Sequence, residues 1–130
     1  MERKHWLAMR RQVDRWMPLE GCGLLAGKGE IVELCLGIPN QERSPLSFRM
    51  PARWQWRAFQ KIESAGLDLL AIFHSHPAGP DFPSARDIAE CMYPVVQVIW
   101  SHQDGHWEAR GFMLQGGQAV EIPLQVLPAE

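Results

Sequence analysis

The chain is organised around residues 69–87, which read LLAIFHSHPAGPDFPSARD. The solid apolar run Leu69–Phe73 is typical of a strand that is covered on both faces. Three prolines and a glycine make residues 74–83 loop-like, and a short helix is predicted from Ser84 to about Tyr93. The stretch therefore predicts a buried strand, a stiff loop and a helix in direct succession.

Two histidines and an aspartate in this stretch can meet at one point. His74 and His76 follow the buried strand, and side chains two apart in an extended segment point to the same side. Asp87 lies one turn into the helix, so its carboxylate can return to the same place. Two neutral imidazoles and a carboxylate form a zinc site whose fourth position stays open to water, which is typical of catalytic zinc. The spacing predicts one zinc ion per chain.

Each of these residues also has an ordinary structural explanation. A His-x-His pair alone is a weak signal. Ser84 and Asp87 fit the S-x-x-D pattern of a helix cap, and those two residues by themselves favour capping. Glu20 opens an otherwise apolar strand, a position usually occupied by a solvated residue. None of these explanations accounts for two histidines directly before the cap.

The rest of the chain reads as one α/β domain over residues 1–130. Apolar residues at three- and four-residue steps predict a helix from Trp6 to Met17, which Pro18 ends, and a second helix lies between Pro51 and Gly66. The predicted strands, loops and turns are a hairpin of 20–26 and 30–36 around a turn at 27–29, a loop at 37–46, a short extended edge piece at Ser47–Met50, and a β-meander of 95–100, 106–114 and 119–127 with turns at 104–105 and 116–117.

Composition excludes several classes of protein. Of 130 residues, 46% are hydrophobic and 22% charged, which is globular rather than disordered. Thirteen Lys and Arg face fifteen Asp and Glu, so the net charge of −2 gives no support for nucleic acid or an acidic membrane as a partner. No apolar run approaches the ~20 residues of a membrane span. Three cysteines without a C-x-x-C pair indicate neither disulfides nor a Cys-rich zinc site, so a cytoplasmic location is predicted.

The pattern H-x-H, seven residues, S, two residues, D, with a glutamate far upstream, resembles the JAMM motif. JAMM proteins are the metalloprotease branch of the MPN (Mov34-like) domains. The matching residues are His74, His76, Ser84, Asp87 and Glu20. Similar surroundings extend the resemblance over nearly the whole chain: residues 20–27, Asn40, 47–50, 73–77, Tyr93-Pro94 and 110–112.

The resemblance implies a fold, a cofactor and roles. The fold would be the cytidine-deaminase-like α/β/α sandwich with a mixed, curved sheet. His74, His76 and Asp87 would bind one Zn²⁺. Glu20 would act as general base and then as proton donor to the leaving amine, and Ser84 would help stabilise the oxyanion. Because ligation occupies Asp87, Glu20 is the carboxylate that the spacing leaves free to accept the water's proton.

The implied reaction is hydrolysis after the C-terminal Gly-Gly of a ubiquitin-like or sulfur-carrier protein, as in the compact prokaryotic members of the family. One alternative is a non-catalytic MPN-type scaffold, and MPN domains often pair, so a homodimer is a further expectation. Another is a role linked to DNA repair. Base deamination is disfavoured, because the H-x-E and P-C-x-x-C signature of the deaminases is absent. The sequence does not identify the substrate or distinguish isopeptide from linear cleavage.

A few other residues carry weaker predictions. Cys22 could face the zinc, but a small core residue is the better interpretation. The histidines outside the motif are predicted at the surface: His5, His102 and His106. Trp6 and Trp16 are predicted in the core, and any partner-facing aromatic is sought among Trp54, Trp56, Trp100 and Trp107.

Overall fold

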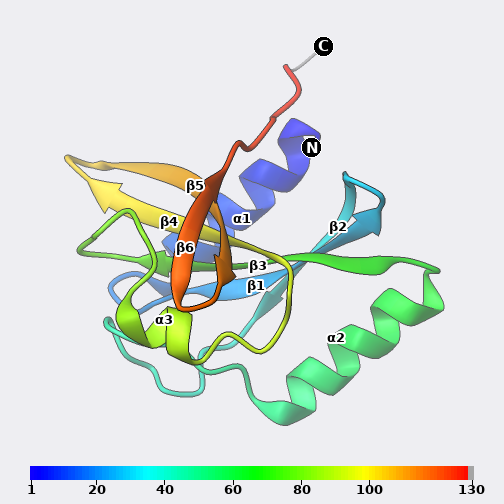
Figure 1. Ribbon diagram of the computed structural model, residues 1–130, viewed down its shortest axis with the longest axis horizontal. Helices are drawn as coiled ribbons and strands as arrows, with labels where there is room; N and C mark the ends of the chain where they lie inside the picture. The colour runs from blue at the N-terminus through cyan, green and yellow to red at the C-terminus, as the bar shows by residue number, and fades with distance from the viewer. Residues whose placement is uncertain (129–130) are drawn as a thin grey trace.

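A computed structural model describes residues 1–128 as one mixed sheet with helices on its two faces (Figure 1). The strand order is β2-β1-β3-β4-β5-β6. Strands β3 and β4 are parallel, and all other neighbouring pairs are antiparallel. The elements in chain order are α1 (Arg3–Trp16), β1 (Cys22–Lys28), β2 (Ile31–Ile38), α2 (Ala52–Ser64), β3 (Asp68–His76), α3 (Ala85–Ala89), β4 (Val96–Gln103), β5 (His106–Gln115) and β6 (Gln118–Ile122).

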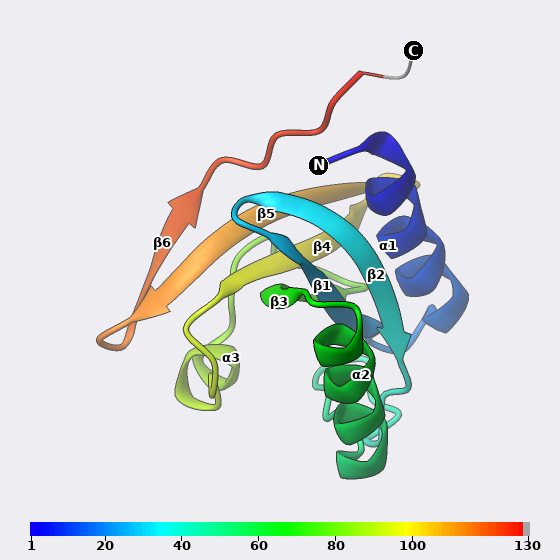
Figure 2. The same cartoon turned by 90° about the vertical axis from the view of Figure 1, so that its right-hand side faces the viewer.

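The sheet has a separate apolar core on each face. In Figure 1, α1 lies above the central strands β1 and β3, and α2 and α3 lie below them. Met9 and Val13 of α1 pack with one set of strand side chains, which includes Phe73. Ile62 of α2 packs with the alternate set, which includes Ile72. This alternation is the period of two expected of a strand buried on both sides. The predicted α/β/α sandwich with a mixed sheet is confirmed, and Figure 2 shows its curvature.

Turn residues place the ends of the elements as predicted. Gly66 adopts a left-handed backbone (φ 70°) directly beyond α2, and the amide of Leu67 donates to the carbonyl of Ile62. The turns at 104–105 and 116–117 also have positive φ, as the tight hairpin turns of twisted strands require. The last third of the chain is the predicted meander.

Several predicted boundaries are wrong. The hairpin strands span 22–28 and 31–38 instead of 20–26 and 30–36, so the turn lies at 29–30 instead of 27–29. Strand β3 continues through His76, so 74–76 belong to the sheet and not to the loop, because β1 and β4 supply backbone partners there. Helix α3 ends at Ala89 instead of near Tyr93, and β6 ends at Ile122, where Pro123 follows. The piece Ser47–Met50 lies outside the sheet and is not an edge strand.

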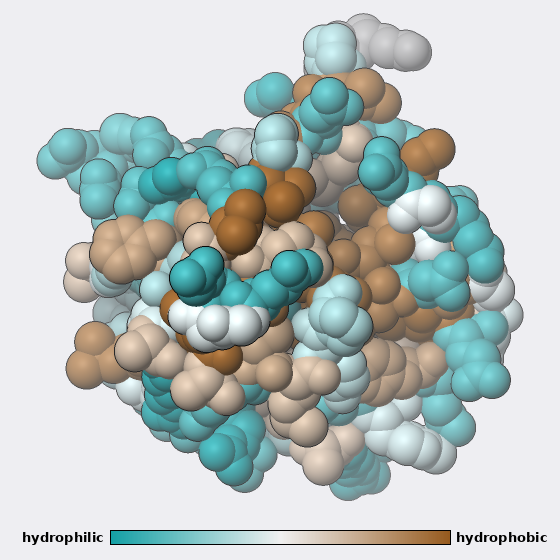
Figure 3. Space-filling model, viewed as in Figure 1, coloured by the Kyte–Doolittle hydropathy of each residue, from teal (hydrophilic) through white to brown (hydrophobic). Residues whose placement is uncertain are grey.

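The tryptophans and His5 divide differently from the prediction. Trp100 and Trp107 are buried, whereas Trp6 and Trp16 are only half-buried. Trp54 and Trp56 are exposed. His5, predicted at the surface, is one of the buried residues of α1, whereas His102 is half-buried and His106 is exposed. Apolar side chains gather near the centre of the face in Figure 3, with hydrophilic ones around them. Within residues 1–128, no helix is long and apolar enough to cross a membrane.

Candidate metal centre

The centre is built on the last three residues of β3, the strand between β1 and β4. Cys22 pairs with His74 on one side, and Ile99 pairs with it on the other. His74 and His76 are 1% and 5% exposed, and their Nε2 atoms are 3.2 Å apart. Ser75 has the opposite orientation, and its hydroxyl accepts a hydrogen bond from the amide of Gly21 at 2.8 Å. The sheet therefore fixes both imidazoles and also ties them to the segment that carries Glu20.

Asp87, on helix α3, contributes the third side chain of the metal centre. Its Oδ2 atom lies 3.1 Å from Nε2 of His74 and 3.1 Å from Nε2 of His76. The same oxygen accepts from the amide of Ser84 at 2.8 Å, and the Ser84 hydroxyl accepts from the amide of Asp87 at 3.0 Å. This reciprocal pair is a capping box, so the capping interpretation of Ser84 is confirmed. The cap is also the device that aims Asp87 at the histidines.

Interactions behind the rings orient them. His76 Nδ1 is 2.8 Å from the carbonyl of Pro80, so it donates there and leaves the lone pair of Nε2 facing His74 and Asp87. The ring of Phe48 stacks on His74 at 4.4 Å between centroids. Next to Pro80, the carboxylate of Asp81 accepts from Arg110 Nη1 at 2.7 Å. Strand β5 therefore holds the loop that orients His76.

The donor set fits a zinc ion. Three ligand atoms lie 3.1–3.2 Å from one another, and a shared proton or a bound cation is needed to offset the repulsion of their lone pairs. Ligands at about 2.0 Å on a tetrahedral zinc stand roughly 3.3 Å apart, close to this spacing. Burial favours deprotonation of His74, whose pKa is lowered, and a zinc ligand must be neutral imidazole. Burial opposes ionisation of Asp87, but its interactions with His74 and His76 outweigh burial and hold the pKa of Asp87 well below its usual range.

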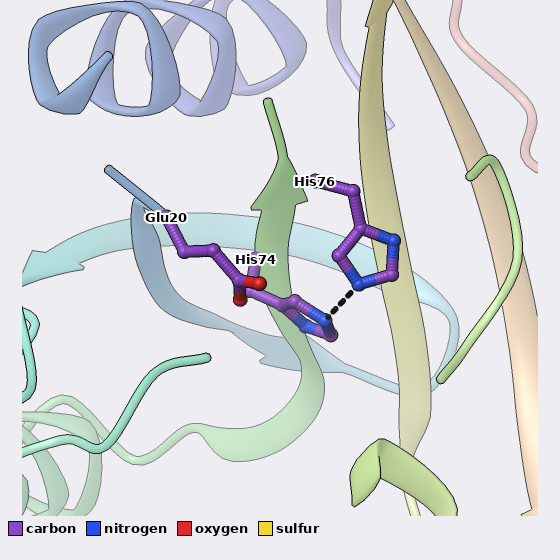
Figure 4. A group of neighbouring side chains, drawn as sticks. All are labelled: Glu20, His74 and His76. Carbon is purple, nitrogen blue, oxygen red and sulfur yellow. Dashed lines mark hydrogen bonds between the residues drawn. The ribbon is translucent and has the colours of Figure 1, made fainter. Parts of the chain in front are cut away.

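Glu20 reaches the same place from the segment before β1. Its amide donates to the carbonyl of Ser44 at 2.8 Å, and its carbonyl accepts from the side chain of Asn40 at 3.1 Å. One ligand atom each of Glu20, His74 and His76 lie within 4.8 Å of one another (Figure 4). Glu20 is 3% exposed, and its Oε1 has no hydrogen-bond partner within residues 1–128. Burial raises the pKa of Glu20 to about 8, against the attraction of His76. The carboxyl can therefore take up a proton near neutral pH.

The fold brings together four predicted site residues and adds others. Glu20, His74, His76 and Asp87 converge, with Ser84 beside Asp87. Cys22 is a core residue, and burial raises the pKa of its thiol to about 12. The sequence did not predict a positioning role for Ser75, Asn40, Pro80, Asp81 and Arg110, although Asn40, Ser75 and Arg110 lie within the stretches that carry the resemblance. Ser75 stands inside the His-x-His pair and could have been suspected there, whereas Arg110 lies far along the chain and had only the resemblance to point to it.

A family model described as prokaryotic homologs of the JAB domain matches residues 2–113. The chain belongs to this family. A relative from Thermus thermophilus named probable TtuB-protein conjugate cleaving protease is 42% identical over 114 residues, 87% of this chain and 74% of the relative. The CysO-cysteine peptidase of Mycobacterium tuberculosis is 32% identical, over 92% of this chain and 85% of its own. The desampylase of Pyrococcus furiosus is 32% identical, over 82% and 76%.

Solved structures show the same JAB-domain fold. A protein from Desulfitobacterium hafniense superposes with a TM-score of 0.87 at 28% identity, covering 99% of this chain and 94% of its own. A structure described as a JAMM metalloprotease-like zinc site in the proteasome and signalosome has a TM-score of 0.62 at 15% identity, covering 98% and 95%. The predicted prokaryotic JAMM/MPN family, its fold and its class of activity, peptide-bond hydrolysis, are confirmed.

Proposed function

We propose that the chain is a zinc-dependent peptidase that cleaves after the C-terminal Gly-Gly of a ubiquitin-like or sulfur-carrier protein. His74, His76 and Asp87 would hold the zinc. The observation that carries the proposal is the convergence of their three donor atoms within 3.2 Å, beside a buried carboxylate that has an oxygen without a partner. A bound zinc would supply Lewis-acid activation of water and of the scissile carbonyl.

Glu20 is the proton carrier in this proposal. It would accept a proton from the attacking water and deliver it to the leaving amine, which needs a pKa near the working pH. Burial raises the pKa of Glu20 to about 8 in the metal-free chain. A nearby cation would favour the carboxylate and so lower this pKa towards neutral pH. Asp87 is unsuited to this role, because its oxygen faces both histidines and its pKa is held low by them.

Ser84 can serve the cap and the reaction together. Its oxygen accepts from the amide of Asp87, which leaves the hydroxyl proton free to donate. Donation to the oxyanion of the scissile carbonyl would stabilise negative charge as it develops. The cap keeps this hydroxyl next to Asp87, the proposed zinc ligand, and therefore close to the metal centre.

The substrate tail would lie along Ser47–Met50. Ser47, Arg49 and Met50 line a cavity of about 640 Å³ that also reaches His74 and Asp87. The backbone of Arg49 is engaged, because its amide donates to Asn40 and its carbonyl accepts from Gln41. The amide and carbonyl of Phe48 bond nothing within residues 1–128, so they can pair with an extended peptide. The substrate tail would pass between the backbone of Ser47–Met50 and the proline-rich loop after His76. Glycines fit such a narrow passage best, because they have no side chain.

Two measurements test the proposal. Protein purified without added metal is analysed for zinc, and close to one equivalent is expected. Zinc-loaded protein is then given a ubiquitin-like protein fused to a reporter through Gly-Gly, Ala-Ala or Val-Gly, and the Gly-Gly junction is expected to be cut fastest. Less than half an equivalent of any transition metal, unchanged on adding zinc, would overturn the metal assignment. Zinc binding without cleavage of any fusion would favour the scaffold alternative.

A further inference from the structure

The positive charge of the chain is concentrated in its first half. Eleven of the 13 Lys and Arg residues lie in residues 1–61, against six Asp and Glu, whereas residues 62–130 hold two and nine. Helices α1 and α2 and strand β2 lie on one side of the molecule, and α3 and β6 lie on the opposite side (Figure 2). The uneven distribution of charge along the sequence is therefore also an uneven distribution over the two sides of the molecule. The small net charge of −2 does not reveal it.

Most arginines on the positive side have no ionic partner. Arg49, Arg86 and Arg110 each bond a carboxylate, and all three lie near the metal centre or its loop. Seven others form no ion pair within residues 1–128: Arg3, Arg10, Arg11, Arg15, Arg43, Arg53 and Arg57. Their charge is therefore available to an outside partner.

Some of them surround a cavity of about 630 Å³ at the end of α1. Arg15, Trp16, Arg43 and Trp54 contribute to its lining, which includes no acidic residue. The guanidinium of Arg43 lies 5.9 Å from the ring centre of Trp16. The nearby acid of α1, Asp14, is engaged elsewhere and accepts a hydrogen bond from Trp107.

Helix α2 continues this positive area beyond Trp54. Arg53, Arg57 and Lys61 recur at every fourth residue and so share one face of the helix. Arg57 lies 5.9 Å from the ring centre of Trp54, which joins the helix face to the cavity. The basic surface is defined here as Arg15, Arg43, Arg53, Arg57 and Lys61 with Trp16 and Trp54.

We propose that the basic surface docks an acidic face of the folded substrate protein while its C-terminal tail enters the metal centre. This inference rests on the proposed function. Leu19 and Pro39 line the cavity and are the sequence neighbours of Glu20 and Asn40, which are joined by a hydrogen bond, so the surface adjoins the centre. An extended tail of six residues spans roughly 20 Å, enough to reach round this segment.

A compact acidic protein fits the charge distribution better than a nucleic acid does. A polyanion longer than the basic surface would also meet the acidic second half of the chain. An acidic patch on a folded protein would contact only the positive side, and its field would steer association. Tryptophan rings beside arginine are common anchors of such interfaces.

The test compares a protein substrate with a short one. TtuB fused through its C terminus to a fluorescent protein, and a fluorogenic hexapeptide with a Gly-Gly junction, are assayed with the double variant Arg43→Glu/Arg57→Glu. At 50 mM salt the KM for the fusion should rise about tenfold with little change in kcat, and higher salt should raise the wild-type KM similarly. Kinetics on the hexapeptide should not change. Arg10→Glu is the matched control, because Arg10 lies 6.0 Å from the ring of Trp6 and does not line the cavity.

The outcomes separate the two proposals. An unchanged KM for the fusion, with normal cleavage of both substrates, would overturn the docking surface alone. Failure of the zinc-loaded wild type on both substrates would overturn the proposed function, and the affinity of Glu20→Gln for the fusion would then decide docking separately. Tight binding of a 30-nucleotide DNA that the double variant abolishes, with no effect on the fusion, would assign the surface to nucleic acid and overturn the inference.

Discussion

Replacing Glu20 by Gln should stabilise the metal-free protein, and more so at pH 8 than at pH 5. Burial raises the pKa of Glu20 from 4.5 to about 8. A carboxyl whose pKa is raised by folding supports the fold fully below pH 4.5, and that support is lost as the pH rises to 8. At about 1.36 kcal/mol per pKa unit, ionising Glu20 would cost up to about 5 kcal/mol. Relaxation and water penetration reduce such costs, so we expect about 2–3 kcal/mol.

The assay is urea unfolding in EDTA, followed by tryptophan fluorescence, for both proteins at pH 5 and pH 8. Comparing the two proteins at each pH removes most of the contribution of His74 and His76, which also titrate differently in the folded state. Glu33→Gln is the matched control, because Glu33 is exposed on β2 and forms no ion pair within residues 1–128; its effect should stay below about 0.5 kcal/mol at both pH values. An advantage of Glu20→Gln that is equal at pH 5 and pH 8 would refute the reasoning.

Four further predictions concern the metal centre. Glu20→Gln should keep zinc, measured by metal analysis, and lose about 10²–10⁴-fold in kcat, because glutamine cannot carry the proton; near-normal turnover would move the role to another residue. His76→Ala should lose the zinc, since two remaining ligands bind weakly, and full metal occupancy would contradict its assignment as a ligand. Ser84→Ala should destabilise the fold by about 1 kcal/mol through the lost cap and lower kcat by about 10²–10³ if the hydroxyl stabilises the oxyanion; a stability loss with a normal rate would restrict Ser84 to capping. Arg110→Gln should weaken zinc affinity about tenfold in a chelator competition, as should Asp81→Asn, because both release the loop that orients His76; affinities equal to wild type would exclude this clamp.

Much of the local structure follows from the sequence. The three- and four-residue steps of α1, the glycines at the turns and the apolar run of β3 each act through neighbouring residues, and these elements were predicted. Boundaries were missed where distant partners decided them. Strand β3 extends through His76 because β1 and β4 offer backbone groups there, a fact that no local pattern contains.

The candidate site divides in the same way. The spacing of His74, His76 and Asp87 alone predicts a three-ligand group, because strand geometry and a helix cap fix how those side chains point. The proximity of Glu20 could be suggested only by resemblance, since it depends on the pairing of β1 with β3. Arg110 stands in a stretch that carries the resemblance, but its contact with the loop of the centre depends on the order of β3, β4 and β5. Contacts within a few residues are set by backbone geometry, whereas contacts across the sheet are set by strand order and register, which exist only in the folded chain.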